Sequence, residues 1–183
     1  VANVTSRLAD ALKFSGLISL SYGAFCFLLP HTPPKRNAVE KLAFKKAFEL
    51  FKEASFTILV VASLAVSIIH QIYFLQTGPF LSHIGILDSQ IGPAMTIGQF
   101  AEIITMAYLG FFLKRLGFHK VISIGIAAYC VRYAIFGTES FPVWVMVISQ
   151  AFHGFCYAFF FAAAYIYVDK IADEDVRHSA QTV

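Results

Sequence analysis

A single carboxylate, Glu102, lies near the middle of an otherwise apolar stretch from Ile91 to Leu113. That stretch is long enough to cross a bilayer, which takes about 20 residues. A carboxylate at the centre of a span costs about 2.5–3.5 kcal/mol even on insertion scales, so it indicates a functional site. Gln99 lies on the same helical face, and Thr96 and Thr105 continue this stripe. We favour a stripe that faces a cavity over scattered hydrogen bonds between helices.

A second polar group lies in the apolar stretch 143–168. His153 is near its middle, and Gln150 and Tyr157 share its helical face. A lone histidine at such a position most often serves packing. Opposite the Glu102 carboxylate at a similar membrane depth, however, a functional role for His153 and a packing role are equally favoured.

Gln71 and Phe74 lie one turn apart in the apolar stretch 56–75, and we slightly favour the lining of a cavity over packing for them. Amide side chains offer both hydrogen-bond donors and acceptors, and aromatic rings offer flat faces for stacking. This combination suits a neutral solute that is polyhydroxylated or heterocyclic. Further along, Gly78 and Pro79 predict a break at the outer end of the helix.

The composition indicates an all-α membrane protein. The chain is 58% hydrophobic and 14% charged, whereas soluble domains average about 25% charged residues. The apolar residues form long blocks without the alternation of a transmembrane β-barrel. Five spans are predicted, at 12–29, 56–75, 91–113, 121–136 and 143–168.

Arg132 and the three cysteines lie inside these spans, and we expect them to have structural roles. Arg132, near the outer end of the short fourth span, is expected to extend to the membrane interface. The cysteines Cys26, Cys130 and Cys156 lie far apart in the sequence and are interpreted as packing residues. Their spacing indicates neither a metal site nor a disulfide, and no cofactor is expected.

The basic residues predict the orientation of the chain in the membrane. They concentrate in the loops 30–55 and 114–120 and after the fifth span, whereas the loops 76–90 and 137–142 contain no Lys or Arg. The positive-inside rule therefore places the N-terminus outside and the C-terminus in the cytoplasm. The net charge of +3 follows from this topology, and no nucleic-acid partner is indicated.

The first basic loop contains apolar residues at helical spacing from 37 to 52. This pattern favours an amphipathic helix on the inner leaflet of the lipid bilayer over a partly disordered basic linker. The chain begins at Val1 without an initiator Met or a signal peptide, and it is expected to be an excerpt of a longer protein.

The segment 110–120, Gly-Phe-Phe-Leu-Lys-Arg-Leu-Gly-Phe-His-Lys, has the spacing of the cytoplasmic loop motif of the major facilitator superfamily. It departs from that motif at Lys114, where Asp is usual. More specifically, the chain resembles the nucleoside:proton symporter branch of the superfamily over nearly its whole length. The matching segments, in order, are 29–34, 78–81, 95–102, 111–115, 131–133, 167–169 and 177–181.

The resemblance implies a twelve-span fold of two six-helix bundles, of which this chain holds spans six to ten. Residues 1–29 then form span six, and residues 30–55 form the central cytoplasmic loop with its amphipathic helix. Residues 56–183 begin the C-terminal bundle with spans seven to ten. The N-terminal half of the same transporter, the lipid bilayer, the solute and protons are the expected partners.

The activity that the resemblance implies is proton-coupled import of nucleosides or similar neutral solutes by alternating access, in a bacterial inner membrane. The implied solute-binding residues are Gln71, Phe74, Gln99, Glu102, His153 and Tyr157. Proton coupling falls to Glu102 and His153. The implied cytoplasmic gate consists of Lys114, Arg115, Asp169 and Arg177, although Asp169 and Arg177 are equally consistent with a local ion pair. Phe74 and His153 replace the Asn and Tyr expected in nucleoside permeases.

Two alternatives to this activity remain open from the sequence. A sugar or aromatic-acid symporter of the same superfamily would use a similar cavity, and a membrane sensor could retain the fold without transport. A membrane-embedded enzyme is not expected, since neither Gly-x-Ser-x-Gly nor His-Glu-x-x-His occurs in the chain.

Overall fold

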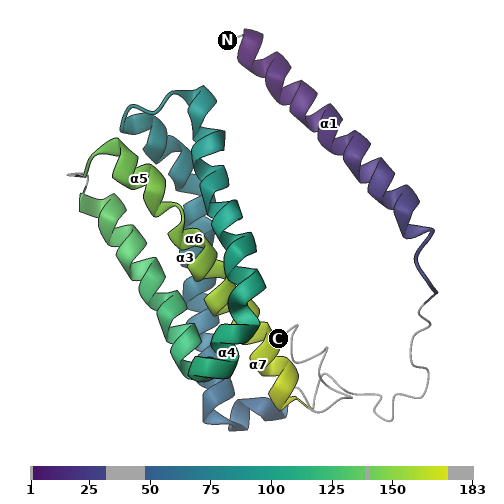
Figure 1. Ribbon diagram of the computed structural model, residues 1–183, viewed down its shortest axis with the longest axis vertical. Coiled ribbons are helices and arrows are strands. Elements are labelled where there is room, and N and C mark those ends of the chain that lie inside the picture. The colour runs from purple at the N-terminus through teal and green to yellow at the C-terminus, as the bar shows by residue number, and fades with distance from the viewer. Residues whose placement is uncertain (1, 32–47, 139–140, 173–183) are drawn as a thin grey trace. The chain divides into compact units, whose positions relative to one another are not determined.

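The computed structural model describes residues 2–31, 48–138 and 141–172, and the chain divides into two units, 1–38 and 39–183 (Figure 1). The described residues of the first unit form the helix α1 (Ala2–Cys26) and a short stretch after it. Within this helix, Lys13 Nζ lies 3.2 Å from Asp10 Oδ1. The helix begins ten residues before the predicted first span and therefore includes charged residues.

Among the described residues, three helical stretches are long and apolar enough to cross a membrane. They are Ala54–His83, Asp88–Thr138 and Val143–Ile171. The helix α1, which carries Asp10, Lys13 and several serines, is not among them. The arrangement of five spans therefore remains a prediction.

The helix α3 (Ala54–His83) follows a short 3-10 turn, η1 (Leu50–Lys52), and continues through Pro79. The predicted break at Gly78–Pro79 is wrong. Proline removes only one backbone donor, and an apolar setting favours a helix because it satisfies the remaining backbone groups internally. The helix ends after His83, where Gly85 adopts a φ of 94° and Ile86 N–H donates to Leu81 O at 3.0 Å. This is a Schellman motif.

The long helix α4 (Asp88–Thr138) consists of two helical segments that meet at Gly117. Gly117 has a φ of 79° and a ψ of 166°, a conformation essentially restricted to glycine. The two segments run in opposite directions (Figure 1). The glycine thus explains how a loop motif that looks short in the sequence reverses the chain.

The last membrane-length stretch is not one regular helix. It consists of α5 (Val143–Ser149), α6 (Phe152–Cys156), the π-helix η2 (Tyr157–Ala162) and α7 (Ala163–Ile171). A tight turn at residues 150–151 separates α5 from α6, with His153 N–H donating to Gln150 O at 2.9 Å. The predicted continuous span at 143–168 is therefore interrupted twice, although neither Gly nor Pro occurs at residues 150–151.

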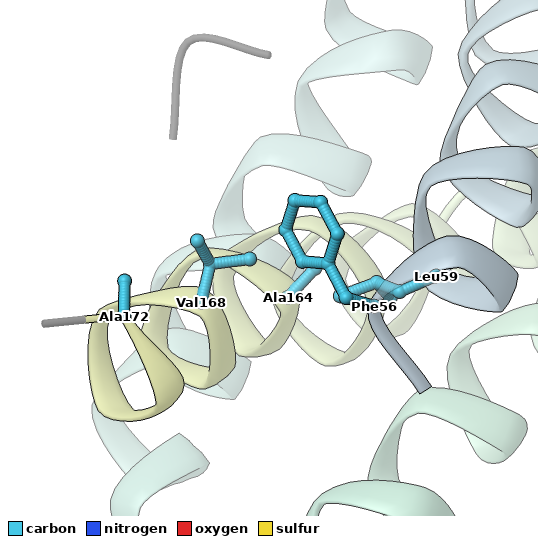
Figure 2. Close-up of a cluster of buried hydrophobic side chains, with 5 residues drawn as sticks. All are labelled: Phe56, Leu59, Ala164, Val168 and Ala172. Carbon is cyan, nitrogen blue, oxygen red and sulfur yellow. The ribbon is translucent and has the colours of Figure 1, made fainter. Parts of the chain in front are cut away.

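One end of the second unit is held together by an apolar cluster, which we define as Phe56, Leu59, Ala164, Val168 and Ala172 (Figure 2). The cluster joins the first turns of α3 to α7. The turn at Gly117 lies at the same end, since the ring of Phe118 is 5.4 Å from that of Tyr167 in α7. The basic residues Lys52, Lys114, Arg115, Lys120 and Lys170 therefore belong to this end of the unit.

The outer surface of α3 is rich in apolar side chains. Ile58, Val61, Leu64 and Ile68 are all exposed, as expected for a helix that faces lipid. Cys156 is buried, whereas Cys26 and Cys130 are exposed. The packing interpretation therefore agrees with the structure for Cys156 and stays a prediction for Cys26 and Cys130. The predicted amphipathic helix lies mostly outside the described residues.

Candidate functional site

The interior of the second unit contains a layer of polar side chains at the level where α4 meets α6. We define this polar layer as Tyr73, Glu102, Arg132, Gln150 and His153. Four of its members are buried, and the side chain of Glu102 at its edge is 26% exposed. The layer draws on α3, both segments of α4 and the turn into α6, so no single sequence pattern contains it.

Glu102 and His153 lie side by side in this layer. The distance between His153 Nε2 and Glu102 Oε2 is 3.7 Å, slightly beyond a hydrogen bond. The structure therefore brings together the two residues assigned to proton coupling from the sequence. A shift of a few tenths of an ångström in either side chain would close the hydrogen bond.

Glycines allow the two helices to approach each other here. A Cβ added at Gly154 would lie 2.4 Å from the carbonyl carbon of Ala101 and 2.6 Å from the backbone nitrogen of Glu102. On the facing helix, a Cβ at Gly98 would lie 3.1 Å from the Cβ of His153. Small residues at such positions let membrane helices pack backbone to backbone. This contact fixes the depth of Glu102 relative to His153.

Arg132 lies fully buried in the polar layer, so the prediction that it extends to the interface is wrong. Its guanidinium carbon lies 3.6 Å from the centre of the Tyr73 ring, and its Nη1 lies 3.2 Å from His153 Nδ1. Arginine favours aromatic faces, and here both the ring and the imidazole lie inside the bundle. Its Nε and Nη2 have no hydrogen-bond partner within the described part of the chain.

Gln150 is also fully buried, and its Oε1 accepts a hydrogen bond of 3.0 Å from the hydroxyl of Tyr73. Its Nε2 lacks a partner among the described residues. The sequence placed Gln150 on the same face as His153 but did not assign it to the site. The turn at residues 150–151 orients this amide inward, and no local sequence signal predicts that turn.

His70 contacts the rings of three residues that the sequence assigned to solute binding. Its ring stacks on that of His153 with centroids 5.5 Å apart and an angle of 10°, and it lies 5.0 Å from Phe74 and 5.8 Å from Tyr157. Its Nδ1 is 2.8 Å from the hydroxyl of Tyr129. Sequence reasoning did not assign His70 to the site, although a histidine inside an apolar span beside Gln71 was an available signal.

The remaining predicted solute contacts are exposed. Gln71 and Gln99 lie on the surfaces of α3 and α4, and Phe74 is 47% exposed. The threonines of the predicted stripe bond within their own helix, since Thr96 Oγ1 donates to Gly92 O and Thr105 Oγ1 to Ala101 O. The structure thus joins Phe74, Glu102, His153 and Tyr157 through neighbouring contacts, and leaves both glutamines outside that set.

Three of the four predicted gate residues are described by the structure, and they lie at the end of the second unit that contains the apolar cluster. Lys114 and Arg115 are exposed just before Gly117, and the guanidinium of Arg115 lies 5.5 Å from the Phe111 ring centre. Asp169 is partly buried in α7. Arg177 lies outside the described residues. Within the described ranges, no three His, Cys, Asp or Glu side chains gather in a way that could hold a metal ion.

Comparison with known proteins gives a consistent picture. Residues 5–183 match the family model described as nucleoside H+ symporter. The chain is 32% identical over 166 residues to YegT of Escherichia coli strain K12, whose name gives nucleoside transport as a provisional assignment. It is 27% identical over 178 residues to the xanthosine permease of the same organism. These alignments cover 87% and 89% of this chain, and 39% and 43% of the relatives.

A solved structure supports the same relationship. The crystal structure of a mutant of the nucleoside transporter NupG matches the chain with a TM-score of 0.70 and 28% sequence identity. The match covers 86% of this chain and 43% of that structure. The chain therefore spans about two fifths of the length of the relatives it matches.

Proposed function

Because this chain belongs to the nucleoside H+ symporter family, we propose that it forms part of a transporter that imports nucleosides or similar small neutral solutes together with protons. The observation that carries the proposal is the Glu102 carboxylate beside the His153 imidazole, at 3.7 Å, inside an apolar helical bundle. A carboxylate in such a setting is retained for function. The chain makes up about two fifths of the relatives' length, so the activity belongs to the complete transporter.

In this proposal Glu102 carries the coupled proton. One charge moved across the membrane is worth about 2.3 kcal/mol per 100 mV. Since a tenfold concentration ratio corresponds to about 1.4 kcal/mol, one proton could concentrate a neutral solute roughly fiftyfold at that potential. A single carboxyl is therefore sufficient on energetic grounds. Its side chain is 26% exposed, so a proton can reach it, and His153 at 3.7 Å gives it a polar neighbour when it is charged.

The solute is proposed to bind against the exposed side chains around Glu102. Gln71 and Gln99 offer amide donors and acceptors, and Phe74 and Tyr157 offer rings for stacking on a base. The aromatic contacts around His70 support this proposal because they bring Phe74 and Tyr157 to the His70 ring, which stacks on His153 beside Glu102. The other wall of the cavity would come from the N-terminal half of the transporter.

The proposed topology follows the charges. Residues 1–29 form span six of twelve, residues 30–55 the central cytoplasmic loop, and residues 56–183 the first four spans of the C-terminal bundle. The chain then enters span six from outside and ends in the cytoplasm of a bacterial inner membrane. Support comes from the basic residues at the end of the bundle that contains Gly117 and the last turn of α7. Lys114, Arg115, Asp169 and Arg177 are proposed to form a gate there.

Uptake by the purified complete transporter in proteoliposomes tests the function. With an inward proton gradient, labelled uridine should accumulate inside above its outside concentration, and a protonophore should abolish the accumulation. Inosine, xanthosine and a hexose serve as competing solutes that define the substrate class. Absence of gradient-driven uptake of any nucleoside would contradict the proposal.

A further inference from the structure

We propose that Arg132 is a positioning residue that keeps His153 neutral, with its single ring proton on Nε2 and directed at Glu102. The inference deepens the proposed function, on which its transport consequence rests. Arg132 Nη1 lies 3.2 Å from His153 Nδ1, within hydrogen-bond distance. A guanidinium has only donors and stays protonated in proteins. His153 Nδ1 must therefore accept, and its lone pair cannot carry a proton.

The other ring nitrogen then holds the proton. In a neutral imidazole with an accepting Nδ1, the hydrogen is on Nε2. That nitrogen is the one 3.7 Å from Glu102 Oε2. His153 consequently presents a donor to the carboxylate, and the guanidinium determines from the far side of the ring which nitrogen does so. This is the same logic by which the partner on one histidine nitrogen sets the role of the other.

The guanidinium is held in place by groups independent of His153. Its carbon lies 3.6 Å from the ring centre of Tyr73, 5.6 Å from that of Phe136 and 5.9 Å from that of Tyr133. The Arg132 side chain is fully buried, so water does not compete for this contact. Arg132 is thus a fixed positive charge rather than a mobile one.

The surroundings of His153 disfavour a second proton on the ring. From α3 it meets the stacked ring of His70 and the ring of Tyr73, and from α4 it meets Arg132 and Glu102. A doubly protonated His153 would place two cationic groups 3.2 Å apart and lose its acceptor for Arg132. Glu102 is the acidic group on the other side, so the proton that moves during transport is assigned to Glu102 and not to His153.

Nitrogen NMR of the complete transporter labelled with 15N-histidine tests the assignment without any transport assay. The His153 signals are identified by their loss in His153→Gln. We expect an unprotonated Nδ1 and a protonated Nε2 at neutral pH, because the two nitrogens have distinct shifts in each tautomer. A proton on Nδ1, or a doubly protonated ring, in the unmodified protein would overturn the inference.

Substitutions of Arg132 provide a second test of the tautomer assignment by the same NMR measurement. Arg132→Met should convert the single tautomer into a mixture, and Arg132→Lys, which restores a donor, should return it toward the Nε2–H form. Lys120→Met, an exposed residue at the other end of the bundle, is the control and should leave the His153 shifts unchanged. Unchanged His153 shifts in Arg132→Met, in protein that remains folded, would also overturn the inference.

For transport, we expect the pH dependence of gradient-driven uptake to change in Arg132→Met, because His153 can then accept a proton. At the pH where the unmodified protein is most active, uptake by Arg132→Met should fall at least tenfold. Arg132→Lys should restore part of that uptake. If the tautomer is found but no nucleoside is accumulated by the unmodified protein, the proposed function fails and the structural assignment stands. If uptake is normal and the tautomer is absent, the inference on Arg132 fails alone.

Discussion

The polar layer and the apolar cluster of the second unit are built in opposite ways. The apolar cluster joins regular turns of α3 and α7 with side chains that carry no polar atoms (Figure 2). The polar layer lies beside a broken helix, and within the described ranges it leaves Nε and Nη2 of Arg132 and Nε2 of Gln150 without partners. Unsatisfied buried donors are costly. The apolar cluster therefore contributes cohesion, whereas the polar layer contains buried donors that its described neighbours do not satisfy.

Backbone geometry follows the same division. Around the apolar cluster, α3 and α7 are regular α-helices. Beside the polar layer the chain passes through the turn at residues 150–151 and the π-helix η2. Such irregular helices are frequent at functional sites and near transport sites in particular. The comparison predicts that changes in the apolar cluster affect stability alone, whereas changes in the polar layer can affect both stability and proton coupling.

The largest effect is expected where the polar layer depends on a close backbone contact. In Gly154→Ala the new methyl carbon would lie 2.4 Å from the carbonyl carbon of Ala101. Because backbone cannot rotate away, we expect a loss of more than about 3 kcal/mol of stability, the upper end for overpacking. Thermal unfolding in detergent measures it. The control is Gly92→Ala, where no atom lies within 4 Å and stability should not fall. Equal stability of both variants would contradict the contact.

A smaller effect is expected in the apolar cluster. Leu59→Ala removes a buried side chain and should cost about 2–3 kcal/mol through the cavity it leaves. Leu64→Ala makes the same chemical change on the same helix at a position that is 67% exposed, and it should cost little. In both variants the uptake per folded molecule should keep the pH profile of the unmodified protein. A shifted profile in Leu59→Ala would break the division between cohesion and coupling.

Tyr73→Phe tests one hydrogen bond inside the polar layer. It removes the donor of the 3.0 Å bond to Gln150 Oε1 and leaves that amide oxygen unpartnered by Tyr73. The expected cost is about 1–2 kcal/mol. The double variant Tyr73→Phe with Gln150→Leu should recover part of this loss, because it also removes the stranded amide. A double variant that loses the sum of both single losses would show that the two groups do not interact.

The smallest predicted effect concerns solute choice. Phe74→Asn restores the amide expected in nucleoside permeases and should raise the affinity for nucleoside in an exchange assay by up to about tenfold, or about 1.4 kcal/mol. Phe74→Leu, which removes the ring without adding an amide, is the matched control and should not raise it. An affinity that is unchanged in Phe74→Asn would remove Phe74 from the proposed solute site.

The sequence predicted the helical membrane class, the reversal near Gly117 and the meeting of Glu102 with His153. These follow from hydropathy, a motif glycine and polar residues at helical spacing, which are local properties. The burial of Arg132 was not predicted because its guanidinium packs on the aromatic face of Tyr73, which lies far away in the sequence. The turn at residues 150–151 was missed for a related reason. No Gly or Pro marks it, and packing against Gly98 shapes it.

Pro79 shows the opposite error. Its residue type favours a helix break, yet α3 continues to His83 because helical hydrogen bonding is favoured in an apolar setting. Local propensity thus gave way to the environment in this helix. The rings around His70 belong to residues that can be identified in the sequence. Their contacts with His70, however, depend on tertiary packing and could not be predicted from it.

The central claim is that Glu102 carries the coupled proton. Solute-driven proton uptake by proteoliposomes, recorded with an internal pH indicator, tests it most directly in the complete transporter with Glu102→Gln. We predict that added uridine acidifies the interior with the unmodified protein and causes no pH change with Glu102→Gln, although that variant still exchanges internal for external uridine. Undiminished proton uptake by Glu102→Gln would contradict the account and assign the proton elsewhere.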